Sequence, residues 1–219
     1  MPAKVLPDEE RFHRFEEYML KEGFRKLSSL EFSSSYTRLG LQAPRSREGR
    51  ETGFVFTANG LTICVWTTFL ENAGRARDED AGWVVITEGD RPGYYSHPIM
   101  RTEGFLRKLF RSAKIAKERI LNRPLCPDCR AFMKITKGPS LKTRYWSCTG
   151  KARPHRVQTL SWDYGLSDES IVFVKALRKA RRDYRANLKK NGKTVVPAML
   201  VRKPWSRKPW QRTQLVDRT

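Results

Sequence analysis

The chain has 219 residues, which is enough for one domain and a small additional module, and its hydrophobic fraction of 39% supports a core over part of that length. Its formal net charge of +21 is uneven: residues 1–100 carry 13 Lys and Arg against 15 Asp and Glu, a sum of −2, whereas residues 101–219 carry 31 against 8, a sum of +23. Without a secretory signal or an apolar run long enough to span a bilayer, the sequence predicts an intracellular, cytoplasmic protein and makes a membrane a minor alternative to nucleic acid as its partner.

Residues 1–123 predict a near-neutral α+β domain that starts with a helix and a hairpin. Apolar side chains recur at helical spacing over residues 8–22, after Asp8, which is a suitable N-cap. Asn59-Gly60 then lies between two apolar, β-rich runs, and this dipeptide supplies the positive φ angles of a tight turn. The pattern therefore predicts an amphipathic helix followed by a β-hairpin.

A second strand pair and a second helix complete this domain. Residues 83–87 and 94–99 flank the turn-forming sequence EGDRPG. Over residues 102–120, apolar side chains recur every three or four positions with lysine and arginine between them, and Pro124 prevents the helix from continuing. The expected order is a helix, four antiparallel strands and a helix, with one face of the second helix on the sheet and another face basic.

Cysteine spacing predicts a metal site in residues 124–160. Cys126-Pro-Asp-Cys129 is followed after eighteen residues by Cys148 and after six more by His155, and the segment between the pairs has the pattern of strand, Gly-Pro turn and strand. Tetrahedral zinc takes two close ligands from each of two knuckles, so the spacing predicts a zinc ribbon with one structural Zn²⁺. A reducing compartment favours metal ligation over disulfides for these cysteines.

The motif CPDC, the sequence RYWSC and the final TGKARPH also resemble the small zinc ribbons at the C-termini of bacterial type I topoisomerases. The resemblance covers residues 124–156 and differs in placing His155 where that family has a last cysteine. It includes none of a topoisomerase's catalytic tyrosine domain. The resemblance therefore implies contact with nucleic acid and not topoisomerase activity.

Two aromatic residues of the ribbon lie among cations, an arrangement that can stack a base while neutralising phosphates. Strand alternation places Tyr145 and Trp146 on opposite faces, so one is expected inside and one exposed. The candidate nucleic-acid contacts of the ribbon are Lys134, Lys137, Lys142, Arg144, Tyr145 and Trp146.

Residues 161–192 predict a basic amphipathic helix that starts at Ser167 and ends before Asn191-Gly192. Few acidic residues accompany its cations, and this favours phosphate binding over a merely solvated face. The candidate contacts of this helix are Arg178, Lys179, Arg181, Arg182, Arg185, Lys189 and Lys190.

Residues 193–219 repeat Arg-Lys-Pro-Trp and contain too much proline for a helix, so they predict an extended basic tail. Tryptophan in a tail without a core of its own suggests ordering on a base or a partner. The candidate contacts of the tail are Arg202, Lys203, Trp205, Arg207, Lys208 and Trp210.

Three functions remain open from the sequence. The first is a non-enzymatic binder that holds single-stranded or structured DNA or RNA largely through its backbone. The second is a structural subunit of a large nucleoprotein complex, ribosome-like or RNA-guided, which docks on protein through residues 1–123, holds nucleic acid through its basic half, and would be found at the nucleoid or in such a complex. These two differ in whether the isolated chain binds tightly.

The third function is a metal-dependent nuclease built on the carboxylates and His97 around the second hairpin. The Glu-x-Lys spacing of many restriction-type nucleases is absent after Glu88, so no catalytic residue is assigned. Cys64, within the apolar run LTICVW, is expected to be a small buried hydrophobic residue without chemistry.

Overall fold

The structure is a computed structural model, and it describes residues 8–28, 31, 49–70, 82–89, 91–95, 104–137, 144–148 and 159–190. Within these ranges, no helix is both long enough and apolar enough to cross a membrane. The helices and strands run in the order α1 (Asp8–Lys21), β1 (Arg25–Lys26), β2 (Gly49–Ala58), β3 (Leu61–Leu70), β4 (Gly82–Glu88), β5 (Arg91–Tyr95), α3 (Phe105–Leu121), β6 (Lys134–Lys137), β7 (Arg144–Ser147), β8 (Thr159–Ser161) and α4 (Asp168–Lys190).

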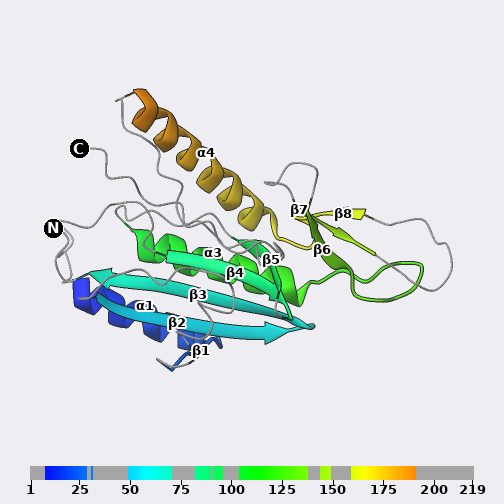
Figure 1. Ribbon diagram of the computed structural model, residues 1–219, viewed down its shortest axis with the longest axis horizontal. Helices are drawn as coiled ribbons and strands as arrows, with labels where there is room; N and C mark the ends of the chain where they lie inside the picture. The colour runs from blue at the N-terminus through cyan, green and yellow to red at the C-terminus, as the bar shows by residue number, and fades with distance from the viewer. Residues whose placement is uncertain are drawn as a thin grey trace, which may run out of the picture.

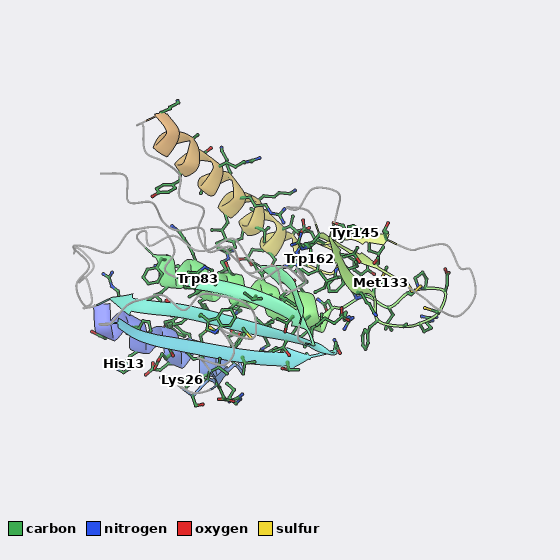
Figure 2. The ribbon with its side chains drawn as sticks, in the orientation of Figure 1. His13, Lys26, Trp83, Met133, Tyr145 and Trp162 are labelled. Carbon is green, nitrogen blue, oxygen red and sulfur yellow. The ribbon has the colours of Figure 1, made fainter. Side chains whose placement is uncertain are left out.

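The strands form two antiparallel sheets, which confirms the predicted mixture of helices and antiparallel strands. The large sheet has the order β1-β2-β3-β4-β5, and the small sheet has the order β6-β7-β8. Figure 1 shows the two sheets side by side, joined by α3, with α4 running from the small sheet past α3. In Figure 2, Trp83 marks the large sheet and Tyr145 the small one.

The hairpin between β2 and β3 turns at Asn59-Gly60, as predicted. Both residues have positive φ angles, 49° and 71°, and Ala58 pairs with Leu61 across the turn. The Asn59 side chain also donates two hydrogen bonds of 2.9 Å to the carbonyl oxygens of Ile120 and Leu121. Since these carbonyls lie in the last turn of α3, the hairpin tip caps the C-terminal end of that helix.

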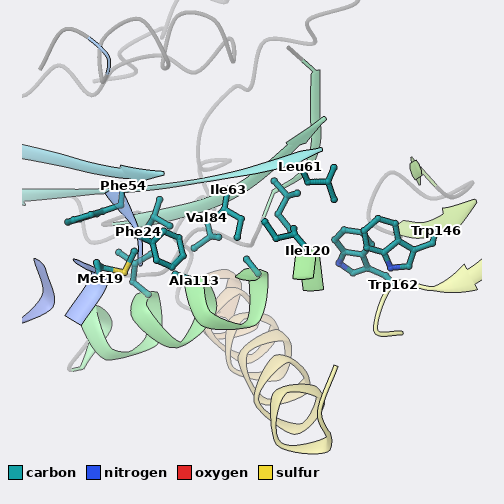
Figure 3. Packing of buried hydrophobic residues seen from close by; sticks show 14 of the residues in the cluster. Met19, Phe24, Phe54, Leu61, Ile63, Val84, Ala113, Ile120, Trp146 and Trp162 are labelled. Carbon is teal, nitrogen blue, oxygen red and sulfur yellow. The ribbon is translucent and has the colours of Figure 1, made fainter. Parts of the chain in front are cut away.

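The main core lies between the large sheet and the helices α1 and α3. Phe15 and Met19 of α1 and Ala113 and Ile120 of α3 pack against sheet residues such as Phe54, and all five are at most 3% exposed. Figure 3 shows the helices together on one side of the sheet, with the side chains of Met19, Ala113, Ile120 and Phe54 between the two layers. The apolar stripes predicted for both helices therefore face this core.

A second apolar surface lies on the other face of the large sheet. Trp66 of β3 and Trp83 of β4 are directly opposite each other in the strand register, and they are 0% and 7% exposed. Their neighbours Val65 and Val84 belong to the main core, so alternation directs the two tryptophans to the opposite face. Both faces of β3 and β4 are consequently apolar at these residues.

Several boundaries differ from the sequence-based prediction. Strand β1 has two residues and β8 has three, and neither was predicted because such short strands show no periodicity. Strand β5 begins at Arg91, earlier than expected, and residues 96–99 lie outside the described ranges. Helix α3 is preceded by Gly104 with a φ of 71°, and the expected cap Thr102 also lies outside them.

The hydrophobic core continues from the large sheet into the small one. Ile120 near the end of α3 belongs to the same cluster as Met133, Trp146 and Trp162, each of which is at most 4% exposed. The rings of Trp146 and Trp162 lie 4.8 Å apart between centroids, beside Ile120 in Figure 3. The position of the expected domain boundary, 123/124, thus falls inside one cluster.

Arg123 ties the two sheets together from a buried position directly after α3. Its guanidinium donates hydrogen bonds to the carbonyl oxygens of Met133 at 2.9 Å and Asn59 at 2.7 Å, and it forms an ion pair with Glu88 at 2.6 Å. One side chain therefore joins the hairpin tip, the end of β4 and the start of the small sheet. Arg123 and Arg119 together are called the arginine clamp.

Arg119 holds the segment between β8 and α4 in a similar way. It is 2% exposed, and its Nε donates to the carbonyl oxygen of Trp162 at 3.0 Å while its guanidinium lies 4.6 Å from a ring centroid of Trp162. An ion pair of 3.3 Å with Asp163 satisfies the remaining charge. Buried arginines need such partners, because an unpaired charge is costly in an apolar environment.

The turn before α4 sits closely against the end of α3. Asn122 donates a hydrogen bond of 2.7 Å to the carbonyl oxygen of Gly165, where a Cβ atom would come within 2.9 Å of the Asn122 Cβ. Glu118 accepts hydrogen bonds from the Ser167 backbone at 2.5 Å and from the Ser170 hydroxyl at 2.6 Å. These contacts fix where α4 starts and in which direction it leaves the body.

Candidate metal centre and basic surface

A tight turn brings the first two cysteines of the metal motif together. The Cys126 amide donates to the Ala131 carbonyl at 2.8 Å, and the Arg130 amide donates to the Cys126 carbonyl at 2.9 Å. Arg130 has a φ of 57°, a left-handed conformation that lets the chain reverse directly after Cys129. Leu125 and Phe132 pair across the base of this turn, so the knuckle continues into strand β6.

Cys148 joins this pair from the end of β7. The Sγ atoms of Cys126, Cys129 and Cys148 all lie within 4.8 Å of one another, and those of Cys129 and Cys148 are 3.4 Å apart. A tetrahedral metal with metal–sulfur bonds of about 2.3 Å places its sulfur ligands roughly 3.8 Å apart, so the three thiols fit a single ion. The predicted fourth ligand, His155, lies outside the described residues.

The turn also prepares Cys126 for ligation. A hydrogen bond from the Cys129 amide lowers the pKa of the Cys126 thiol to about 7; burial opposes this effect, and the Asp128 amide and the two other thiols reinforce it. Metal ions bind the thiolate, so a lowered pKa reduces the cost of deprotonation on metal binding. Cys126 and Cys148 are buried and Cys129 is exposed, which leaves one side of the cluster accessible.

No protein-family model matches the chain, and no curated protein and no solved structure gives a match. The function of the site is therefore argued from the geometry and charge of its own residues.

The aromatic pair of the ribbon divides as alternation requires. Trp146 is fully buried against Trp162, whereas Tyr145 is half-buried and lies opposite Thr136 and Ser161 on the other face of the small sheet. The prediction that Trp146 contacts nucleic acid is therefore wrong for this fold, because its indole is enclosed by the core. Tyr145 remains the ribbon aromatic with a reachable ring.

The predicted cations of the ribbon are placed only in part. Lys134 is exposed on β6, and Arg144 is half-buried on β7. Lys142 and the side chain of Lys137 lie outside the described structure.

Helix α4 carries a row of exposed cations. Lys175, Lys179, Arg182 and Lys190 are exposed, while Arg178 is half-buried and approaches Asp163 at 3.9 Å. The side chains of Arg181, Arg185 and Lys189 lie outside the described set, as do the tail residues Arg202, Lys203, Trp205, Arg207, Lys208 and Trp210.

Three cations of α3 form contacts with other elements of the fold, which the sequence did not indicate. Lys114 forms an ion pair with Glu22 at 2.8 Å. Lys117 donates to the Glu22 carbonyl at 2.5 Å and lies 5.0 Å from the ring centroid of Phe56. Arg111 pairs with Glu169 and lies 4.4 Å from the ring centroid of Phe173. The expected basic face of α3 thus joins α1 and α4 to the body.

Of the residues considered for a nuclease, the structure describes Glu88 alone. Glu88 is the ion-pair partner of Arg123, and Asp78, Glu79, Asp80, Asp90 and His97 lie outside the described ranges. His13 is exposed on α1, at the opposite end of the molecule from Tyr145 in Figure 2. Cys64 is 7% exposed on β3, in agreement with the prediction of a buried position.

Sequence reasoning missed the residues that position these surfaces. Arg119, Arg123, Glu118 and Asn59 all act through contacts between segments far apart in the chain. The one local signal was the location of Arg123 between a helix end and Pro124, where the chain must change direction.

Proposed function

We propose that this chain is a zinc-stabilised protein that binds nucleic acid through the phosphate backbone, with α4 as its main contact surface. The observation that carries the proposal is the contrast between helices. Arg111, Lys114 and Lys117 of α3 have partners within the fold, whereas Lys175, Lys179, Arg182 and Lys190 of α4 are exposed and form no ion pair with a described residue. Such a row attracts a polyanion and gains affinity by releasing condensed counterions.

Zinc is the proposed ion because of the ligand set. Thiolate ligands at tetrahedral spacing favour zinc over hard cations such as Mg²⁺ and Ca²⁺, which take oxygen ligands. The resemblance of residues 124–156 to topoisomerase zinc ribbons supports the same choice, with His155 as the fourth ligand. The ion would be structural, because it would hold a hairpin too small to be stable alone.

The metal proposal is tested by replacing Cys126 or Cys148 with serine in the full chain and measuring bound zinc by atomic emission. Each variant is expected to lose the metal, because a buried knuckle with two thiolates binds weakly. Cys64→Ser serves as the control, since Cys64 lies in the large sheet away from the cluster. Full zinc occupancy in the Cys126 and Cys148 variants would remove the ligand assignment.

The binding proposal is tested by fluorescence anisotropy of labelled DNA and RNA oligonucleotides over several salt concentrations, with a denaturing gel afterwards. The triple variant Lys175→Ala, Lys179→Ala, Arg182→Ala is expected to lower the salt slope by roughly 3, since each phosphate contact contributes about 0.9. Alanine favours the helix, so α4 should stay folded. The matched control removes three exposed cations from α1: Arg11→Ala, Arg14→Ala and Lys21→Ala.

Each outcome has a defined meaning. Tight binding that weakens with salt, and is reduced by the α4 variant but not by the α1 control, supports the proposal. Equal losses of affinity in both triple variants would mean that binding depends on the net charge of the protein and not on a contact surface at α4. Weak binding to every oligonucleotide would overturn an autonomous binder and favour a subunit of a larger complex, and shortened strands would favour a nuclease.

A further inference from the structure

The three described cysteines of the metal centre differ in their exposure to solvent. Cys126 and Cys148 are buried, with 0% and 4% of their surface exposed, whereas Cys129 is exposed. The residues on either side of Cys129, Asp128 and Arg130, are exposed as well. A small molecule in solution therefore reaches Cys129 more readily than it reaches either buried cysteine.

Cys148 lies next to this exposed thiol. The Sγ atoms of Cys129 and Cys148 are 3.4 Å apart, so a movement of about 1.4 Å would bring them to the length of a disulfide bond. Cys148 follows strand β7, which is paired on both sides and holds Trp146 against Trp162. Cys129 lies in a turn outside the strands, so the movement is expected from the side of Cys129.

The other pairings of the cysteines are less favourable. Cys126 is buried and fixed within its turn, because its amide donates to the Ala131 carbonyl at 2.8 Å and its carbonyl accepts a second backbone hydrogen bond of 2.9 Å. Cys64 is buried on β3 of the large sheet and does not belong to the cluster. Cys129 with Cys148 is therefore the pair that joins an exposed thiol to an adjacent one.

We infer that Cys129 is a site of oxidation by peroxides, and that its oxidation forms a disulfide with Cys148 and releases the metal. This inference rests on the proposed zinc site and adds a redox reaction to it. Cysteines that respond to oxidants are typically accessible to solvent and lie beside a second thiol that resolves the first product. Cys129 has both properties.

The reaction takes place in two steps. The Cys129 thiolate attacks one oxygen of hydrogen peroxide, the O–O bond breaks, and the products are a sulfenic acid on Cys129 and one hydroxide ion. The Cys148 thiolate then attacks the sulfenic sulfur, the S–O bond breaks, and a second hydroxide ion leaves as the S–S bond forms. Two protons from solvent convert the hydroxide ions to water, and the two electrons lost by the sulfur atoms reduce the peroxide.

The disulfide would replace the metal as the cross-link of the ribbon. It leaves Cys126 and the predicted ligand His155, which are too few ligands to hold a structural zinc ion tightly. The new bond joins the turn at Cys129 to the end of β7, as the metal does, and closes a loop that contains β6. Closing such a loop restricts the unfolded chain and so stabilises the folded hairpin. The ribbon therefore keeps a cross-link in both redox states.

The inference is tested by treating the zinc-loaded full chain with hydrogen peroxide and measuring released zinc with a chromogenic chelator. The oxidised chain is then digested with trypsin and Asp-N protease without reductant and mapped by mass spectrometry. Asp-N cleaves before Asp128 and so separates Cys126 from Cys129. We expect one zinc ion to be released for each disulfide formed, with the peptide 128–130 linked to the peptide 145–151.

Two variants serve as matched comparisons. Cys64→Ser should react like the wild type, because Cys64 lies outside the cluster. Cys129→Ser should lose its remaining free thiols more slowly by at least about tenfold, because the thiols that remain are buried. The peptide map of the wild-type chain decides the pairing even if Cys129→Ser binds zinc poorly.

The outcomes separate this inference from the proposed function. A disulfide between Cys126 and Cys129, a disulfide between Cys126 and Cys148, or unchanged thiols would overturn the inference and leave the zinc site intact. A chain without zinc before treatment that still forms the Cys129–Cys148 bond would contradict the proposed metal and support the pairing. The oxidised chain should also unfold at a higher urea concentration than the reduced, chelator-treated chain, and equal midpoints would overturn its role as a cross-link.

Discussion

Helices α3 and α4 are both amphipathic and basic in sequence, yet their cations have different surroundings. Lys114 and Lys117 of α3 meet Glu22 after α1, and Arg111 meets Glu169 of α4. Lys175 and Lys179 of α4 project away from the body with no ion-pair partner among the described residues. The comparison teaches that the density of positive charge along a helix does not identify a binding surface. A binding surface is identified instead by whether the rest of the fold supplies the cations of the helix with partners.

The largest expected effect on this comparison comes from the arginine clamp at the end of α3. Arg123→Met should lower the free energy of unfolding by about 3–5 kcal/mol, because it leaves Glu88 and two carbonyl oxygens without their buried partner. Urea unfolding measures this change. Arg107→Met, at an exposed position of α3, is the control and should change little.

A second variant separates lost packing from an unpaired charge at this clamp. If the cost arises from the carboxylate, Arg123→Met combined with Glu88→Leu should recover part of the stability. A loss below 1 kcal/mol in the single variant would show that the clamp is not structural, and the contrast between the two helices would then be weaker.

An intermediate effect is expected from a matched pair of lysine substitutions. Lys117→Ala removes a hydrogen bond to the Glu22 carbonyl and a contact with the Phe56 ring, and should cost about 1–2 kcal/mol of stability with little change in DNA affinity. Lys175→Ala should lower the affinity for DNA and leave the stability nearly unchanged, because the Lys175 side chain is exposed. Thermal unfolding and anisotropy on the same samples measure both quantities. Equal losses of affinity would contradict the division between the helices.

The smallest expected effect concerns pH at the junction between α3 and α4. Burial raises the pKa of Glu118, but the hydrogen bonds from Ser170 and Ser167 outweigh it and hold the pKa below the ordinary 4.5. A lowered folded pKa stabilises the fold above pH 4.5, and this contribution is lost as the pH falls through the folded pKa.

Glu118→Gln tests this dependence. The variant should be less stable than the wild type at neutral pH, and the two unfolding free energies should converge in acid, as urea titrations at several pH values would show. A constant difference at every pH would mean that the carboxylate charge does not anchor α4.

The sequence predicted the elements whose residue pattern can be recognised within a short stretch of the chain. The helices at residues 8–22 and 167–190, the turn at Asn59-Gly60 and the Cys126–Cys129 pair are of this kind, since each depends on neighbouring residues. It could not predict which of Tyr145 and Trp146 is buried. Alternation gives opposite faces, but Trp162, sixteen residues farther along, decides which face is covered.

The same limit applies to the basic residues. Arg123 is indistinguishable by type from the exposed arginines of the chain, and its role depends on Glu88 and Met133, which are brought to it by the fold. Charge counting therefore identified the basic half of the molecule but not which cations hold it together.

The stacked pair of Trp146 and Trp162 has an optical consequence. Two indoles in ring contact couple their electronic transitions and contribute a paired band to the circular dichroism spectrum. Trp146 lies two residues before Cys148, and Trp162 is held by Arg119, so this band depends on the ribbon being folded against the body. The protein thus contains its own spectroscopic signal for the packing of the small sheet against the body, readable in the intact chain without a label.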